Sequence, residues 1–206
     1  MALLVERGEH TLALTNRGAG TTAPTAYGTL KLAFDAIIAG THTGAINIEV
    51  CGNMTETATA SLTASGVGAA SYTSVTIRPV GGARIIEGSI IGAIIKLDGA
   101  DNVAIDGRQG GAGSARDLTV RNNSTAAATA AVWLASVAAG NGASNNTVRN
   151  LEIAAGAAQN TGTNSTFGII MCGTTISTSY AGSRTTLPAR PMSARYSDLF
   201  GSRGQD

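Results

Sequence analysis

Three short apolar segments recur along this 206-residue chain at one constant interval. They are IIKLDG (94–99), AVWLAS (131–136) and GIIMCG (168–173). At each step the aligned residues Leu97, Leu134 and Met171 are 37 positions apart. A unit of this length cannot bury its apolar face alone, so successive copies must stack on one another.

The stretches between these segments alternate apolar and polar residues with a period of two, which is typical of β-strands. Gly, Asn and Asp stand at their ends and tolerate the backbone of tight corners, so Asp98-Gly99 and Asp106-Gly107 are interpreted as corners. The sequence therefore predicts an all-β fold, a short right-handed parallel β-helix of about three to four coils. Its turns after the first contain NVAIDG (102–107) with DLTVRN (117–122), and NTVRN (146–150) with LEIAAG (151–156).

The first turn is assigned in the same way, from three alternating stretches before the first IIKLDG segment. These are AINIEV (45–50), SVTIRP (74–79) and ARIIEG (83–88), with the stretch 51–73 as a long loop inside the turn.

One stretch has a helical period instead. In TLKLAFDAIIAG (29–40), apolar residues recur at the spacing of one helix face, and Gly40 is a candidate C-terminal cap. We expect a helix over 28–39 that covers the N-terminal end of the stack. The chain then divides into an N-terminal segment (1–26), the β-helix with its capping helix (27–177) and a non-repeat tail (178–206) that could cover the other end.

Composition excludes several function classes. The formal charge is +1, so there is no electrostatic footprint for nucleic acid or an anionic membrane. No apolar run approaches the roughly 18 residues of a membrane span, and charges interrupt the start too early for a signal peptide. His10 and His42 both precede or begin the first strand pattern, which argues against histidine catalysis and zinc. We expect Cys51 and Cys172 not to be joined.

Stacking the repeats gives a candidate site. If Leu97, Leu134 and Met171 point inward, Glu49 and Asp98 lie side by side in one outward column, with strands roughly 4.8 Å apart. Asn47, Lys96 and Trp133 lie in the next column.

We assign catalytic roles to Glu49, Asp98 and Lys96, and substrate binding to Trp133 and Asn47. Two adjacent carboxylates could share a Ca²⁺ ion, the cofactor expected here, or divide acid and base roles. The alternative is that the acids are corner residues neutralised by Lys96, with Trp133 under a loop. A second polar set comprises Asp117, Thr119, Arg121 and Glu152, in which Arg121 and Asp117 are expected to form a surface ion pair.

NVAIDG, NTVRNLEI and the helix TLKLAFDAIIAG before AINIEV resemble units of the pectate-lyase-like right-handed parallel β-helix superfamily. Similar strings occur in coil repeats of secreted bacterial surface proteins. The resemblance covers about residues 27–177, and it implies a carbohydrate polymer as ligand and an extracellular or cell-surface location. The catalytic signatures of polygalacturonases, pectin methylesterases and classical pectate lyases are not found, so none of their residues is carried over.

Three functions remain open from the sequence. The first is a carbohydrate-active or carbohydrate-binding β-helix, including a Ca²⁺-assisted hydrolase or lyase that acts on an extended polymer. The second is a non-catalytic surface or adhesive module, and the third is an ester or lactone hydrolase. The expected partners are a polysaccharide or small-molecule substrate and a second copy at the coil end, with no nucleic acid and no membrane.

Overall fold

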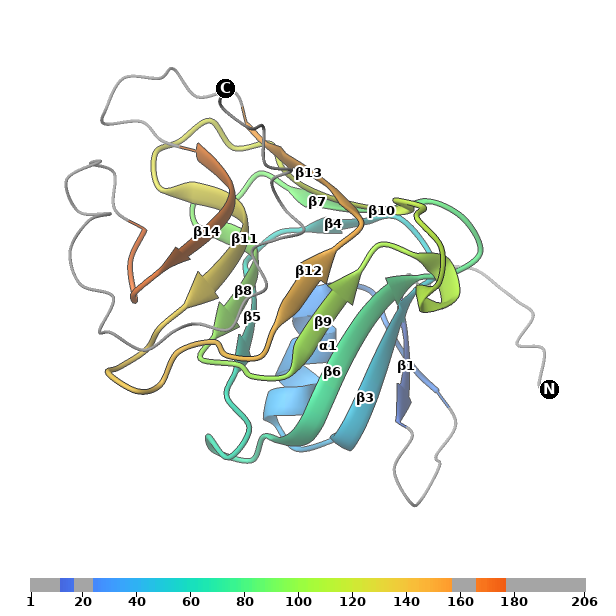
Figure 1. The fold of residues 1–206 in the computed structure, drawn as a ribbon, viewed down its shortest axis with the longest axis horizontal. Helices are drawn as coiled ribbons and strands as arrows, with labels where there is room; N and C mark the ends of the chain where they lie inside the picture. The colour runs from blue at the N-terminus through green and yellow to red at the C-terminus, as the bar shows by residue number, and fades with distance from the viewer. Residues whose placement is uncertain (1–11, 17–23, 157–165, 177–206) are drawn as a thin grey trace, which may run out of the picture.

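The computed structural model describes residues 12–16, 24–156 and 166–176, and this part of the chain is an all-β fold with parallel sheets (Figure 1). It also contains the α-helix α1 (Leu30–Ile38) and the short 3₁₀ helix η1 (Gln109–Gly111). The predicted tail, 178–206, lies outside the described residues. Among the described residues no helix is long and apolar enough to cross a membrane.

The strands form three sheets, which we name A, B and C. Sheet A has the order β12-β9-β6-β3-β1-β2, sheet B the order β13-β10-β7-β4, and sheet C the order β14-β11-β8-β5. In sheet A the strands are β1 (Leu12–Asn16), β2 (Thr25–Tyr27), β3 (Thr43–Val50), β6 (Ser71–Pro79), β9 (Val103–Asp106) and β12 (Thr147–Arg149). Sheet B contains β4 (Met54–Glu56), β7 (Arg84–Gly88), β10 (Leu118–Asn122) and β13 (Leu151–Ala155). Sheet C contains β5 (Ala60–Thr63), β8 (Ala93–Asp98), β11 (Thr129–Ala135) and β14 (Thr166–Cys172).

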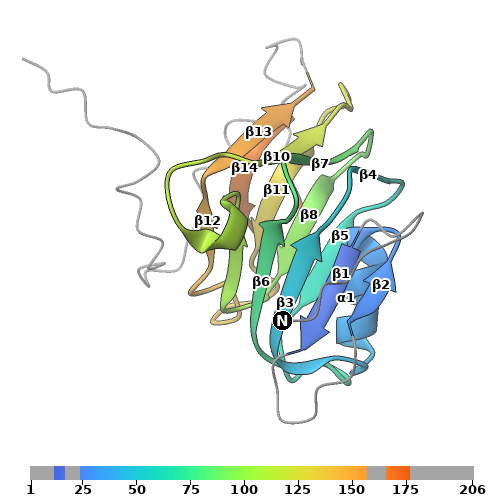
Figure 2. The same cartoon turned by 90° about the vertical axis from the view of Figure 1, so that its right-hand side faces the viewer.

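From β3 onward, consecutive strands belong to sheets A, B and C in turn. Neighbours within each sheet are parallel over this range, whereas β1 pairs with both β2 and β3 antiparallel. Figure 2 shows α1, β1 and β2 at one end of the molecule and β12, β13 and β14 toward the other.

The register predicted from the 37-residue interval is confirmed. Leu97 stands opposite Leu134, and Leu134 stands opposite Met171, in parallel strands of sheet C. Leu97 and Leu134 are buried, whereas Met171, in the same column, is 37% exposed. In the described part of the chain β14 is the last strand of sheet C, and no further strand covers its side chains.

The assignment of the first turn is wrong. AINIEV and SVTIRP form β3 and β6, which are adjacent strands of sheet A and therefore belong to successive passes of the chain. The missing strands of the first pass, β4 and β5, lie within 51–73, the stretch predicted to be a loop. They are only three and four residues long, and their inward positions include Glu56 and Ala60, so the apolar alternation is weak.

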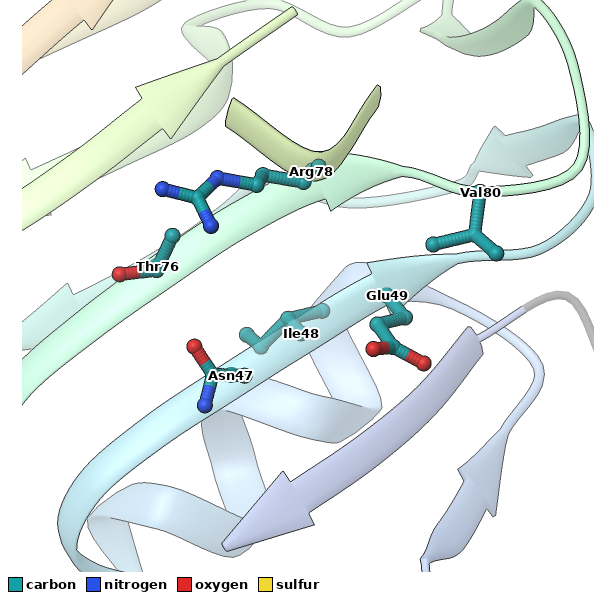
Figure 3. Close-up of a pocket in the computed structure, with 7 residues that line it drawn as sticks. Asn47, Ile48, Glu49, Thr76, Arg78 and Val80 are labelled. Carbon is teal, nitrogen blue, oxygen red and sulfur yellow. The ribbon is translucent and has the colours of Figure 1, made fainter. Parts of the chain in front are cut away.

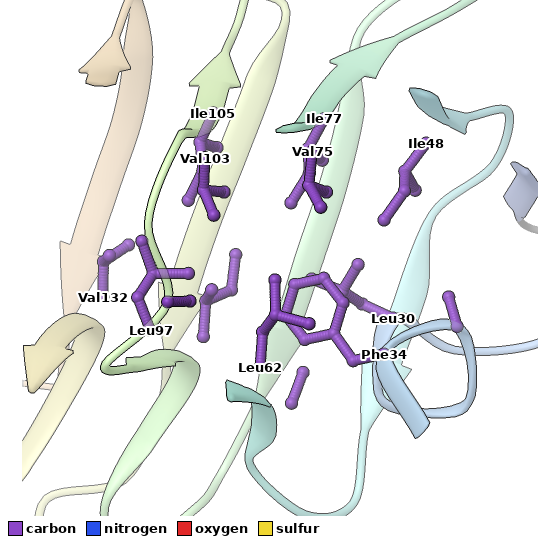
Figure 4. Packing of buried hydrophobic residues seen from close by; sticks show 14 of the residues in the cluster. Leu30, Phe34, Ile48, Leu62, Val75, Ile77, Leu97, Val103, Ile105 and Val132 are labelled. Atoms are coloured by element: carbon purple, nitrogen blue, oxygen red, sulfur yellow. The ribbon is translucent and has the colours of Figure 1, made fainter. Parts of the chain in front are cut away.

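The predicted helix is confirmed to within two residues. The Thr29 hydroxyl caps its start by accepting a hydrogen bond from the Leu32 N–H (3.2 Å). Its end is a Schellman turn in which Gly40 adopts a φ of 75° and the Thr41 N–H donates to the Ala36 carbonyl (3.0 Å). The helix packs against β5, and Phe34 lies beside Leu62 (Figure 4).

The core lies between the sheets. Ile48, Ile77 and Ile105 stand at matching positions of β3, β6 and β9, all at most 1% exposed (Figure 4). Burial of each such side chain stabilises the fold by about 1.5–3 kcal/mol.

Polar groups at the corners are satisfied by side-chain amides. Asn122, the last residue of β10, is buried; its Nδ2 donates to the carbonyls of Ile90 and Ala130 (both 2.9 Å) and its Oδ1 accepts from the Ile90 N–H (3.1 Å). Gly99 takes a φ of 73°, as its predicted corner role requires. Gly107 instead packs so closely against the Asn150 carbonyl that no β-carbon would fit.

Candidate binding face

The structure separates the two acids that were predicted to be neighbours. Glu49 lies on β3 in sheet A, and Asp98 lies on β8 in sheet C. Glu49 stands opposite Arg78, whereas Asp98 stands opposite Thr63 and Ala135. The predicted side-by-side pair is therefore wrong, and with it the Ca²⁺ site shared by these two carboxylates. The error follows from aligning AINIEV with IIKLDG, which occupy different sheets in each pass.

The other predicted column is correct only for Lys96 and Trp133, because Asn47 lies on β3 in sheet A, and the pair is not an open platform. Lys96 stands opposite Trp133, and its Nζ lies 4.3 Å from the Trp133 ring centroid and 2.9 Å from Asp98 Oδ1. Trp133 is only 7% exposed and packs in a small cluster outside the main core with Ala93, Ala130, Ala135 and Ile176. The expected exposed stacking surface is wrong, and the alternative of a covered tryptophan is correct. Lys96 is held here by Asp98 and by the indole.

Cys172 borders the same cluster. Burial raises the pKa of its thiol, while the Trp133 indole N–H and the Lys96 ammonium act in the opposite direction. The raised pKa keeps the group a neutral thiol near neutral pH and not a reactive thiolate. Cys51 and Cys172 are not joined by a disulfide, as expected.

A different set of charged residues comes together on the outer face of sheet A. Glu49 stands opposite Arg78 in the pairing of β3 with β6, and Arg149 stands opposite Asp106 in the pairing of β12 with β9. Arg78 and Asp106 are themselves close, with 3.8 Å between Arg78 Nε and Asp106 Oδ2. The four residues form one row of alternating charge across four parallel strands, which we call the sheet A row.

A depression lies beside this row, with a volume of about 460 Å³ (Figure 3). Asn47 and Glu49 from β3 and Thr76 and Arg78 from β6 supply its polar lining. Two of the predicted site residues, Asn47 and Glu49, are therefore on this surface, and Asp98, Lys96 and Trp133 are on another sheet. The remaining lining residues are Ile48, Val80 and Gly110.

Asp106 is the buried centre of an ion cluster. Arg108 donates to it through Nε and Nη2 (both 2.8 Å), and Arg149 donates through Nε (3.1 Å) and Nη2 (2.9 Å). Burial by itself raises the pKa of Asp106, but the hydrogen bonds and charge of Arg108 and Arg149 outweigh it and lower the pKa to about 2. Asp106 is therefore a carboxylate near neutral pH and has no proton to donate.

The loop after β9 covers Arg78. Gly111 has a φ of 76°, and a β-carbon there would lie 2.8 Å from the guanidinium carbon of Arg78. Gln109 ties this loop to its surroundings, because its Oε1 accepts from the Gly82 N–H and its Nε2 donates to Asp117 Oδ2 (both 3.0 Å). A glycine at 111 thus lets the loop approach Arg78 closely.

The second predicted polar set is partly corrected. Arg121 pairs with Glu87, not with Asp117, at 2.6 Å between Nη2 and Oε2 on the outer face of sheet B. Thr119 and Glu152 do meet, through the Thr119 hydroxyl and Glu152 Oε2 (3.3 Å).

Sequence analysis missed Arg78, Arg108, Asp106 and Arg149 as one group. A signal was present, because Glu49, Arg78, Asp106 and Arg149 each follow an inward Ile or Val near the end of a sheet A strand. Aligning INIE, VTIR, VAID and NTVR would have placed all four in one row.

Within the described ranges, no group of three or more His, Cys, Asp or Glu side chains is arranged to hold a metal ion. Calcium stays an untested expectation. Comparison of the chain with protein-family models, curated proteins and solved structures found no match.

Proposed function

We propose that this chain is a short right-handed parallel β-helix that binds an extended carbohydrate polymer on the outer face of sheet A. The β-helix is supported by the regular passage of the chain through sheets A, B and C, with parallel pairing in each from β3 onward. Right-handedness is supported by the rule that about 98% of parallel crossovers have this hand.

The observation that carries the binding proposal is the polar surface across β3, β6, β9 and β12. Parallel strands repeat at roughly 4.8 Å, so side chains at equal register form a regular series across the sheet. Asn47 and Thr76 offer amide and hydroxyl groups beside the sheet A row, around one depression. Such a surface suits a polymer that lies across the strands and exchanges hydrogen bonds with successive units.

Binding is favoured over catalysis by the state of the carboxylates. Glu49 and Asp98 are on different sheets, and Asp106 is fully buried and already bonded to two guanidinium groups. The predicted pair of Glu49 and Asp98, which was to divide acid and base roles, is therefore not assembled. A Ca²⁺-assisted hydrolase or lyase is the competing proposal, supported only by the superfamily resemblance, which also supports an extracellular or cell-surface location.

The test is a binding screen of the purified chain on immobilised polysaccharides, neutral and charged, with and without Ca²⁺. We expect at least one polymer to be retained, and the Asn47→Ala/Thr76→Ala double variant to bind it roughly thirtyfold more weakly, because each of the two lost hydrogen bonds removes about 1 kcal/mol. Thr119→Ala on sheet B is the matched control and should bind normally.

Loss of binding in the control alone, or retention of no polymer at all, would contradict the proposal. Release of new reducing ends or unsaturated sugars from a bound polymer would support the enzyme instead.

A further inference from the structure

We propose that Arg78 and Arg149 form an oxyanion site, so that the polymer bound on sheet A carries carboxylate or sulfate groups. This inference rests on the proposed function and specifies its ligand. Asp106 and Arg108 do not touch the ligand in this account, and they are positioning residues for the other two guanidinium groups.

The charges around Asp106 do not balance. Three guanidinium groups, from Arg78, Arg108 and Arg149, surround the one carboxylate of Asp106. Like charges this close repel one another unless a further anion joins them. A bound oxyanion would relieve that repulsion.

The positive and negative charges of the cluster lie at different depths. The Asp106 side chain is 0% exposed, whereas the side chains of Arg78 and Arg149 are 35% and 45% exposed. The negative charge is therefore beneath the surface and the positive charge faces outward. A ligand that approaches this face meets guanidinium groups.

Arg78 and Arg149 both have hydrogen-bond donors to spare. Arg149 uses Nε and Nη2 on Asp106 and, within the described part of the chain, makes no hydrogen bond through Nη1. Arg78 makes no hydrogen bond among the described residues. Its buried Nε lies 3.8 Å from Asp106 Oδ2, so Nη1 and Nη2 are the donors that remain for a ligand. Guanidinium groups bind carboxylate and sulfate-like oxygens through such paired N–H donors.

Glu49 does not cancel this excess. Among the described residues no ion pair joins Glu49 to Arg78, and Figure 3 shows the Arg78 side chain extending toward Thr76 and away from Glu49. Glu49 is instead placed to accept hydrogen bonds from neutral hydroxyl groups of the same polymer. The face thus combines one acceptor for hydroxyls with two donors for anions.

Sheet B supplies the contrast. There Arg121 meets Glu87 one to one, and the hydrogen bonds from Arg121 and Asn123 lower the pKa of Glu87. That pair is locally neutral and leaves no excess positive charge. Arg121 is therefore a matched control for the loss of one arginine from an outer sheet face.

The experiment compares three polymers with one backbone: dextran, carboxymethyl-dextran and dextran sulfate. We expect the wild-type chain to bind at least one charged polymer at least tenfold more tightly than dextran. Arg78→Gln and Arg149→Gln should each weaken that binding roughly ten- to a hundredfold, the size expected for a lost hydrogen bond to a charged group. Arg121→Gln should bind as wild type, and the preferred polymer identifies carboxylate or sulfate as the recognised group.

Thermal unfolding checks that each variant is folded. The Arg149→Lys variant separates the effect of charge from the effect of guanidinium geometry. The lysine keeps the charge but lacks the planar fork, so intermediate binding supports the site. Equal binding of all three polymers, with normal binding by the folded Arg78 and Arg149 variants, would overturn the inference and leave carbohydrate binding standing.

A second probe separates the two proposals. Inorganic sulfate, titrated into ¹⁵N-labelled protein, should shift the Nε–Hε signals of Arg78 and Arg149 but not that of Arg121. Such shifts without binding to any polymer would support the oxyanion site and contradict the proposed function. Shifts of Arg121 equal to those of Arg78 and Arg149 would overturn the site.

Discussion

The outer faces of sheets A and C are built alike and end up chemically different. Each has a row of side chains from parallel strands at equal register, with a carboxylate beside basic residues. In sheet C, Lys96 is held by Asp98 and covers the ring of a buried Trp133. In sheet A, the carboxylate of Asp106 is buried and the guanidinium groups of Arg78 and Arg149 face solvent.

The difference shows that charge balance and exposure decide which row can bind a ligand. The sheet C row has one ammonium for one carboxylate, and its aromatic ring contributes to packing. The sheet A row has more positive groups than its buried carboxylate can neutralise. Sheet A is therefore the face we assign to the ligand.

The largest expected effect is the loss of the buried carboxylate in sheet A. Asp106→Ala should lower the free energy of unfolding by about 3–5 kcal/mol, because it leaves the largely buried Arg108 guanidinium without its carboxylate and removes the acceptor that Arg149 also uses. The matched change in sheet C, Asp98→Ala, should lower it by about 1 kcal/mol or less, since that ion pair is partly exposed. Urea unfolding at neutral pH measures both, and equal losses would contradict the contrast.

The next effect concerns the sheet C aromatic residue. Trp133→Ala should lower the free energy of unfolding by about 3 kcal/mol, because a large side chain that is nearly buried leaves a cavity. Polymer binding by the folded fraction should be unchanged. Weaker binding with unaltered stability would instead restore Trp133 as a substrate platform.

A smaller effect is the pH dependence of stability that Asp106 produces. Its pKa is lowered from 3.8 to about 2 in the folded protein, so its contribution is present above about pH 4 and is lost as the pH falls toward 2. We expect a loss of about 1–2 kcal/mol across that window. Asp98→Asn should keep this acid transition and Asp106→Asn should remove it, as followed by urea unfolding at successive pH values.

The smallest effect involves Glu56, a buried carboxylate that faces backbone amides instead of arginines. It accepts hydrogen bonds from the N–H groups of Leu30 (2.6 Å) and Lys31 (3.3 Å) at the start of α1. Burial raises its pKa above 4.5, while those hydrogen bonds and the Lys31 charge oppose the rise and Asp35 adds to it. Its contribution to stability is therefore present below about pH 4.5 and decreases as the pH rises through the raised value.

Glu56→Gln should flatten the pH dependence between pH 4.5 and 7 while keeping a side-chain acceptor for the Leu30 N–H. Unfolding of both proteins at several pH values in this range checks the expectation. A steeper dependence in the variant would show that the assigned direction of the Glu56 shift is wrong.

Sequence periodicity predicted the strands whose inward residues are large. Leu97 and Leu134 fixed the register of sheet C, and the apolar stripe of Leu30 and Phe34 defined the helix. The strands β4 and β5 were missed because small and polar residues occupy so many of their positions. Because these two strands were missed, Glu49 was aligned with Asp98 although the two residues lie on different sheets. The predicted site was therefore wrong.

The exposure of individual side chains was less predictable. The burial of Trp133 depends on Ile176, which comes just after β14 and is 43 residues away from Trp133 along the chain. The burial of Asp106 depends on arginines from β12 and from the loop after β9. Alternation alone marks both residues as outward, because it contains no information on what covers an outer face.

The most direct test of the contrast is an NMR titration of ¹⁵N-labelled protein with the charged dextran that binds best. We predict that the amide signals of Thr76, Ala104 and Thr147, in the strands of the sheet A row, shift with the ligand. The Trp133 indole signal and the amide of Lys96 should stay in place. Shifts concentrated on Trp133 and Lys96, with sheet A unchanged, would contradict the assignment of the binding face.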